Sequence, residues 1–284
     1  MDPWLEFLQL PVQITHWYLA SEGGPLTENR WWGSTVRGAV GSMLRFLLCR
    51  CRAVQHQPQC EFARFFAPEN ITAAGPKFLP PPWALSARVQ GSELEVELRL
   101  FRQAVPLEVL STAVGAAAIR GFGQTRLRLV RWHHSSTTLG ALAAAHPSPR
   151  PVLRLESPTR LQEDGALIQQ APSFSQIFAA AQRRARLCAR AWLGVTLPQP
   201  AYEHWVWARS VPVEAAEVSW LEQLRYSRRQ NQLMRLGGLV GWVRYGGEWS
   251  WAWPWLRLAP ILGLGKLTTM GLGEVRWEDG EGEP

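Results

Sequence analysis

Arginine side chains offer most of the charged chemistry in this chain of 284 residues. Of its 30 basic residues only Lys77 and Lys266 are lysines, so 28 are arginines. A planar guanidinium can hold a phosphate through two parallel hydrogen bonds and can stack on a nucleobase. Together with the net charge of +7 and the 16 tryptophans, this composition favours a polyanionic partner, with nucleic acid as the first candidate. A coding bias toward arginine in a GC-rich genome would account for part of the excess.

The clearest group of arginines lies in the segment 174–194, whose apolar residues recur with helical spacing. On a helical wheel Arg183, Arg186 and Arg190 fall within about 60° of one another, opposite an apolar face. The segment contains no acidic residue that would offset their repulsion. We therefore expect this face to contact phosphate groups, and a solvated arginine face is the alternative. The predicted apolar face consists of Ile177, Ala181, Ala185, Cys188 and Trp192.

A second group of reactive side chains contains three cysteines and a histidine. Cys49, Cys51, His56 and Cys60 could supply four ligands to a zinc ion, but the Cys-X-Cys start is cramped compared with the usual spacing of zinc ligands. Together with the distant Cys188, these cysteines do not suggest a disulfide framework. We therefore expect reduced, partly buried thiols here, with no metal and no other cofactor.

The last stretch of the chain, GLGKLTTMGLGEVRWE at residues 263–278, is rich in glycine. Glycine permits positive φ and a close approach of the main chain to a ligand. Such a segment before a strand can hold a phosphate. A tight turn that closes a sheet is the other interpretation.

The elements that would position these groups occur in two similar sets. Each half of the chain predicts a strand, a helix, two strands, a helix and a glycine-rich entry to a last strand that ends in Val-Arg-Trp. We therefore expect an α+β fold of two tandem ferredoxin-like domains, residues 1–150 and 151–284, with antiparallel sheets. The expected strands include 5–15, 92–101 and 152–158, and the expected helices include 33–49, 106–119 and 174–194.

The sequence shows no segment typical of membrane insertion or secretion. It has no run of 18 apolar residues, and its first residues, MDPWLEFLQL, lack a basic region ahead of the apolar ones. We therefore expect a cytoplasmic protein with no membrane partner.

Three motifs in a fixed order resemble one known family. They are GSTVRGAVGSMLR followed by spaced cysteines and CEFARFF, then YSRRQNQLMRLGGLVGWVRY, then LGLGKLTTMGLGEV. This set resembles the CRISPR-associated pre-crRNA processing endoribonucleases of the RAMP superfamily, and the arginine-rich, tryptophan-rich composition is most similar to their type IV variant. The resemblance implies RAMP/RRM-like domains, a C-terminal glycine-rich loop, binding of a CRISPR repeat hairpin and metal-independent cleavage beside it. It also implies that the mature crRNA stays bound in a complex with other CRISPR effector subunits.

Cleavage of RNA without a metal requires attack of the ribose 2′-hydroxyl on the adjacent phosphorus, giving a 2′,3′-cyclic phosphate and a 5′-hydroxyl. A base, an acid and positive charge on the phosphorane would accelerate this reaction. Many relatives carry a histidine on or near the first helix, whereas WWGSTVRGAVGSMLR has none. We therefore expect Arg30 and Arg37, with Arg244 across a cleft, to orient and neutralise the phosphate. His16, at the end of the first strand, is the secondary candidate for the base.

The remaining RNA contacts are expected in two loops. A run of polar side chains at 227–231 could grip RNA or form a solvated turn, and bare backbone at 263–269 would let RNA approach. Gly271 and Gly273 could serve only to shape the last strand. Beyond the arginine face of the segment 174–194, the predicted RNA-binding residues are Arg228, Arg229, Gly263, Gly265, Lys266, Thr268 and Thr269.

Two other functions remain open on the sequence. One is a catalytically inactive RAMP-fold scaffold that binds crRNA, and the other is an interaction subunit whose tryptophans form a docking surface. Cleavage of a labelled repeat RNA in EDTA separates the endoribonuclease from both. Salt-dependent RNA binding separates the scaffold from the interaction subunit.

Overall fold

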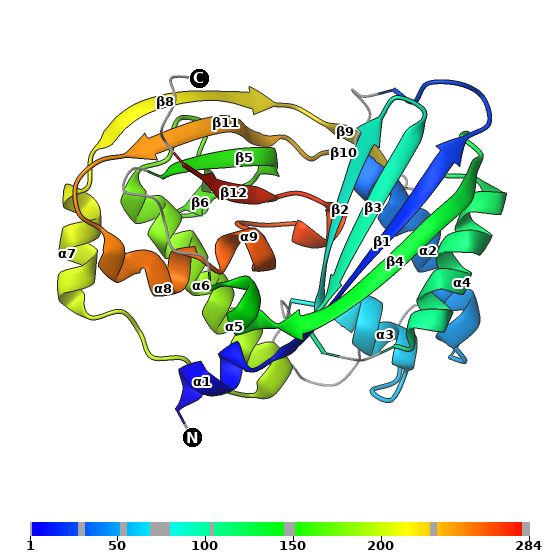
Figure 1. Cartoon of the computed structure of the whole chain (residues 1–284), viewed down its shortest axis with the longest axis horizontal. Helices are drawn as coiled ribbons and strands as arrows, with labels where there is room; N and C mark the ends of the chain where they lie inside the picture. Colours follow the sequence, from blue (N-terminus) through cyan, green and yellow to red (C-terminus); the bar gives the residue numbers. More distant parts are fainter. Residues whose placement is uncertain are drawn as a thin grey trace.

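The first half of the chain forms a four-stranded antiparallel sheet covered by helices on one face (Figure 1). The computed structural model describes residues 2–27, 32–51, 56–68, 80–102, 105–144, 151–227 and 232–279. The strand order β2-β3-β1-β4 and the βαββαβ succession define a ferredoxin-like unit. Its elements are α1 (Pro3–Leu8), β1 (Pro11–Ser21), α2 (Trp32–Leu48), α3 (Glu61–Phe66), β2 (Trp83–Gln90), β3 (Glu93–Leu100), α4 (Leu107–Arg120), β4 (Leu127–Thr138) and α5 (Leu139–Leu142).

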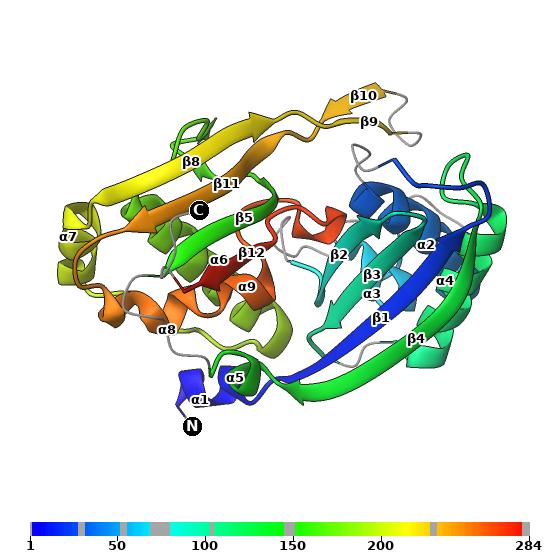
Figure 2. The same ribbon diagram turned by 45° about the horizontal axis from the view of Figure 1, so that its top comes forward.

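The second half repeats this plan with the strand order β12-β5-β11-β8. Its second helix is broken into two short pieces, α8 and α9, and a hairpin of β9 and β10 continues β8 and β11 toward the first half (Figure 2). The elements are β5 (Val152–Thr159), β6 (Gln162–Glu163), β7 (Ala166–Leu167), α6 (Phe174–Leu193), α7 (Tyr202–Ser210), β8 (Val213–Leu221), β9 (Leu224–Ser227), β10 (Gln232–Arg235), β11 (Gly238–Tyr245), η2 (Ser250–Ala252), α8 (Trp253–Leu256), α9 (Ala259–Leu262), η3 (Thr268–Met270) and β12 (Val275–Glu278).

These two antiparallel sheets confirm the expected α+β fold of tandem ferredoxin-like units. Residues 145–150 lie outside the described part of the chain, so the domain boundary at 150 stays a prediction. The start of the chain corrects another expectation, because residues 3–8 form a helix and the first strand begins only at Pro11. The Asp2 carboxylate accepts a hydrogen bond from the Trp4 backbone N–H at 2.9 Å, and Pro3 occupies the first helical position. Both features stabilise a helix N-terminus.

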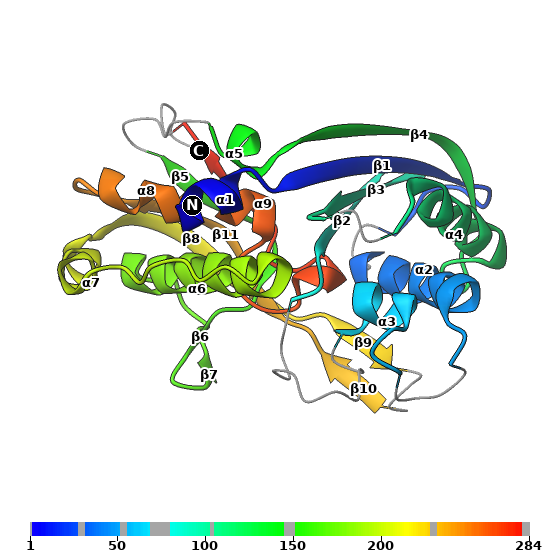
Figure 3. The ribbon, with the colours of Figure 1, turned by 90° about the horizontal axis from the view of Figure 1, so that it is seen from below.

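The buried side chains form two clusters, and their boundary does not follow the middle of the chain. One cluster lies between the first sheet and helices α2, α3 and α4 (Figure 3). The other belongs to the second sheet and α6, but it also contains Phe7 and Leu10 from the α1 region and Leu139 from α5. The ends of the first half are therefore buried in the core of the second half.

Most of the described tryptophans are buried in the core or pack, half-buried, against it. Seven of the 15 tryptophans in the described residues are buried, and two, Trp132 and Trp207, are exposed at 45% and 46%. Trp249, Trp253 and Trp277 contact one another ring to ring beside the second sheet. A docking surface built from the tryptophans is therefore not what the fold presents. The described helices also include none that is both long and apolar enough to span a bilayer.

Candidate functional site

The glycine-rich segment forms a compact double turn ahead of β12. Gly263, Gly265, Gly271 and Gly273 all have φ between 73° and 82°, and Leu267 also has a positive φ of 65°. A Cβ on Gly265 would collide with the backbone carbonyl oxygen of Arg160. Glycine is therefore required at this position because the protein's own main chain approaches it closely.

An arginine that the sequence analysis did not select anchors this segment. Arg184 of α6 donates from Nε and Nη2 to the Leu262 carbonyl oxygen at 3.1 and 3.0 Å, and from Nη2 to Thr268 Oγ1 at 2.8 Å. Thr268 is 4% exposed and Gly263 is buried, so both lie on the inner side of the segment. The positions of these two residues do not support their predicted contact with RNA, whereas Lys266 is exposed and Thr269 is half-buried.

The outer side of the segment packs against the first half of the chain. A Cβ on Gly33, in the first turn of α2, would lie 3.1 Å from Gly271 Cα and would collide with the Met270 carbonyl oxygen. On the adjacent strand β2, Ser86 Oγ donates to Glu274 Oε2 at 2.8 Å, and Arg88 forms an ion pair with the same carboxylate. The N-terminus of α2, the strand β2 and the glycine-rich segment therefore meet at one junction, which we call the α2–glycine junction.

Arg37 follows this junction along α2. Its guanidinium carbon lies 4.7 Å from the centre of the Phe66 ring and 5.9 Å from the Trp83 ring. Such stacking orients a guanidinium and keeps its charge. Arg30 lies outside the described residues, so its predicted role rests on the sequence alone.

Arg244 does not lie across a cleft from Arg37. Arg244 lies opposite Val152 of β5 in the second sheet. The glycine-rich segment meets the same strand six residues later, where the Pro158 carbonyl oxygen accepts a hydrogen bond from the Gly273 N–H. At about 3.3 Å per residue this places Arg244 about 20 Å along the sheet from the glycine-rich segment. Its Nε instead lies 3.6 Å from the Glu214 carboxylate. The structure therefore does not bring Arg37 and Arg244 together.

His16 lies on the face of the first sheet that points away from α2. Its neighbour Trp17 is buried in the same cluster as Val36 of α2, and side chains alternate between the faces of a strand. His16 Nδ1 is 2.9 Å from the Glu95 carboxylate, and the His16 ring stacks on His133 with centroids 4.6 Å apart. These contacts make His16 part of a polar row across the open face of the sheet, on the side opposite to Arg37.

The arginine face of α6 forms as the helical wheel predicts. All five residues of the predicted apolar face are buried, whereas Arg183 and Arg190 are exposed. Arg186 is half-buried and donates from Nε to the Leu197 carbonyl oxygen at 3.4 Å. Within the described part of the chain no carboxylate forms an ion pair with any of the three. Their charge is thus available to an external anion. Arg228 and Arg229 lie outside the described residues.

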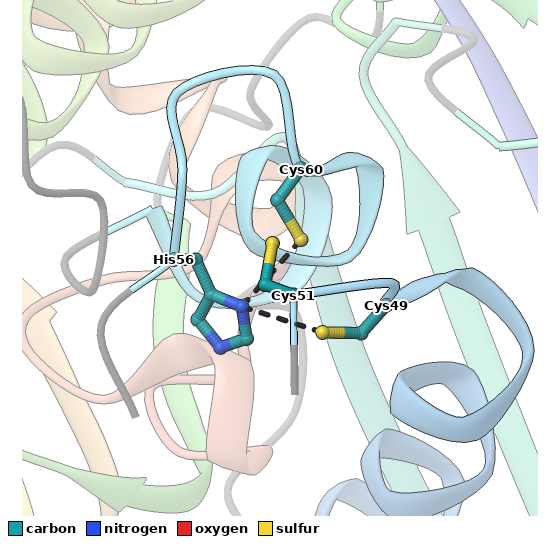
Figure 4. Close-up of side chains that lie close together, drawn as sticks. All are labelled: Cys49, Cys51, His56 and Cys60. Carbon is teal, nitrogen blue, oxygen red and sulfur yellow. Dashed lines mark hydrogen bonds between the residues drawn. The ribbon is translucent and has the colours of Figure 1, made fainter. Parts of the chain in front are cut away.

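The cysteine and histidine group comes together in space, with all four side chains pointing toward one another (Figure 4). Cys49 Sγ and Cys60 Sγ each lie 3.5 Å from His56 Nδ1. The four potential ligand atoms, including that of Cys51, all lie within 4.8 Å of one another. All four cysteines of the chain are among the described residues, and no disulfide joins them.

Comparison with solved structures supports the class of fold. Cas6 (TTHA0078) in a product complex superposes with a TM-score of 0.57 at 18% identity, covering 94% of this chain and 100% of that one. Cas6 (TTHB231) of Thermus thermophilus, also in a product complex, gives 0.58 at 15% identity with 94% and 100% coverage. A partial Cas6-RT-Cas1–Cas2 complex gives 0.54 at 11% identity, covering 95% of this chain and 46% of that one. The chain therefore shares the tandem ferredoxin-like fold of these Cas6 structures.

Family models identify the relationship more closely. Residues 153–275 match the CRISPR-associated endoribonuclease Cas6, and residues 14–147 match a model described as an N-terminal domain. The C-terminal part of the chain thus matches the Cas6 family of CRISPR-associated endoribonucleases, and the chain shares the fold of solved Cas6 structures. No curated protein matches it significantly in sequence. Its assignment to the type IV variant stays a prediction.

Proposed function

We propose that this protein binds the repeat hairpin of CRISPR precursor RNA, cuts beside it without a catalytic metal and keeps the mature crRNA for an effector complex. The observation that carries the proposal is the α2–glycine junction, where a glycine-rich segment closes on the N-terminus of a helix in a Cas6-family fold. A helix N-terminus carries positive partial charge and favours a phosphate. Two structures of similar fold are Cas6 product complexes, which supports the proposal.

The cleavage step follows from the groups at the junction. The scissile phosphate would lie near the α2 N-terminus, with Lys266 exposed on the glycine-rich segment and Arg37 one to two turns along the helix. Their positive charges would stabilise the phosphorane, while attack by the 2′-hydroxyl gives a 2′,3′-cyclic phosphate and releases a 5′-hydroxyl. Arginine stays protonated at ordinary pH and is a poor base, so in-line positioning carries much of the acceleration. A slow enzyme suited to one turnover is the expected result.

The RNA hairpin would be held by charge away from the cut. Among the described residues no carboxylate pairs with the arginine face of α6, and each phosphate that this face neutralises releases counterions. The β9–β10 hairpin projects from the second sheet toward the first half and would contact the same RNA. Its Arg235 is exposed.

Single-turnover cleavage of a labelled repeat RNA in EDTA tests the proposal. We expect cleavage to persist in EDTA and the products to carry a 2′,3′-cyclic phosphate and a 5′-hydroxyl. Arg30→Ala, Arg37→Ala and Lys266→Ala should each reduce the rate by about 10²- to 10³-fold, with RNA binding measured alongside. Tight, salt-dependent binding with no cleavage by the wild type would instead identify the inactive scaffold. Cleavage that requires added magnesium would contradict the proposal.

A triple variant tests the binding surface. Replacing Arg183, Arg186 and Arg190 with alanine should weaken hairpin binding and lower the slope of log affinity against log salt by up to about three phosphate contacts. The matched control removes the same charge from three ion-paired arginines. If the variant that lacks Arg183, Arg186 and Arg190 keeps the wild-type salt slope, the arginine face is solvated and does not contact RNA. The control variant carries Arg131→Ala, Arg154→Ala and Arg276→Ala.

A further inference from the structure

The group formed by Cys49, Cys51, His56 and Cys60 has the dimensions of a metal centre. In a tetrahedral zinc site with Zn–S near 2.3 Å and Zn–N near 2.05 Å, a sulfur and a nitrogen ligand lie about 3.6 Å apart and two sulfurs about 3.8 Å apart. The two measured distances from sulfur to His56 Nδ1 are both 3.5 Å, and all four ligand atoms fall within 4.8 Å of one another. We propose that these four residues bind one zinc ion. The inference does not depend on the proposed RNA chemistry.

The arrangement around His56 favours a shared ion over ordinary hydrogen bonding. One ring nitrogen carries either a proton or a lone pair, so it can make one good hydrogen bond. Here Nδ1 faces Cys49 Sγ and Cys60 Sγ at the same distance, with the sulfur of Cys51 beside them. Three sulfurs around one imidazole nitrogen form the ligand set that suits zinc. The short Cys-X-Cys spacing, which argued against zinc in the sequence, does not prevent both sulfurs from reaching the same centre.

The site is closed, which indicates a structural rather than a catalytic ion. Four protein ligands complete a tetrahedral shell and leave no position for water or substrate. His56 is 3% exposed and Cys60 is 6% exposed, whereas Cys49 and Cys51 are half-buried. Zinc would therefore add no step to RNA cleavage.

The position of the ligands shows what the ion would hold. Cys49 directly follows α2, and Cys60 is the N-cap residue of α3, where no side-chain hydrogen bond caps the helix. The His56 ring contacts Phe62 of α3 with centroids 5.5 Å apart. From the same helix, Phe66 packs on Gly41 of α2. Zinc would join the end of α2 to the start of α3 and would hold the aromatic surface beneath the Arg37 guanidinium.

Metal analysis of the purified full-length protein tests the proposal. We expect about one zinc per chain by elemental mass spectrometry in the wild type. The Cys49→Ser and Cys60→Ser variants should lose most of this metal, and Cys188→Ala, which changes the one cysteine outside the group, should retain it. Cobalt(II) added to metal-free wild type should give the intense visible bands of a tetrahedral ion and its thiolate charge-transfer band. These bands should be absent from Cys60→Ser.

Stability and thiol state provide independent readouts. Removing zinc with a chelator should lower the Tm of the wild type and of Cys188→Ala, and readdition of zinc alone should restore it. A reduced wild-type protein that neither contains zinc nor binds zinc or cobalt(II) would overturn the proposal. So would retention of full metal content by both serine variants, or a disulfide among Cys49, Cys51 and Cys60 whose reduction creates no metal affinity.

Discussion

The contact between α2 and the glycine-rich segment can be tested by one methyl group placed at two positions of the same helix. Alanine is favoured over glycine in a helix interior by about 1 kcal/mol. At Gly38 an added Cβ meets no atom within 4 Å, so Gly38→Ala should stabilise the protein by up to about 1 kcal/mol. At Gly33 the Cβ would lie 3.1 Å from Gly271 Cα and would collide with the Met270 carbonyl oxygen. Overpacking of this kind costs about 1 to 3 kcal/mol, so Gly33→Ala should be destabilised by up to about 2 kcal/mol.

The Gly33→Ala substitution should also slow RNA cleavage. Because the obstructing atoms are backbone, Gly33→Ala must move the glycine-rich segment away from the α2 N-terminus. A misplacement of about 1 Å in a positioned site can cost about 10²-fold in rate. Urea denaturation measures the stability, and single-turnover cleavage with saturating RNA measures the rate. A Gly33→Ala protein that matches Gly38→Ala in both stability and rate would refute the α2–glycine junction as the site.

Three further outcomes follow from individual side chains. His16→Ala should retain most of the cleavage rate, since His16 lies on the sheet face away from α2; a fall of about 10²-fold or more, as for a lost general base, would contradict this placement. Burial raises the pKa of the Cys188 thiol from 9.0 to about 11. The unfolded chain therefore loses this proton first as the pH rises, and the wild type should lose roughly 2 to 3 kcal/mol more stability than Cys188→Ala between about pH 9 and 11, measured by denaturation at each pH. Tyr245→Phe removes a buried hydroxyl that donates to the Pro172 carbonyl oxygen at 2.8 Å and should lower the free energy of unfolding by about 1 to 2 kcal/mol; an unchanged urea midpoint would show that this bond contributes no net stability.

The periodic part of the fold could be predicted from the sequence because local spacing determines it. The helix at 174–193 has the predicted buried and exposed faces, since both depend only on 3.6-residue periodicity. At the N-terminus Leu5 and Phe7 fit an alternating strand by chance. The Asp-Pro pair before them was the competing signal for a helix start.

The site was less predictable because its contacts join distant parts of the chain. Arg184 lies between the two faces of the α6 wheel, and its partner Thr268 is 84 residues away. Arg244 could be assigned to a strand from its neighbours. Nothing local shows which end of that strand faces the glycine-rich segment. The same limit applies to Cys49 and Cys60, because only the path of the chain between α2 and α3 brings their sulfurs to one nitrogen.

The burial of α1 and α5 in the second core bears on how the protein is made. A ribosome completes the first half of the chain before the residues of the second sheet leave its exit tunnel, and domains generally fold in that order. Until then Phe7, Leu10 and Leu139 lack the apolar surface of the second half that completes their burial, although all three are nearly inaccessible in the finished fold. In the nascent chain both ends of the first half therefore stay incompletely packed. The two halves complete their folding together once the second half has been synthesised.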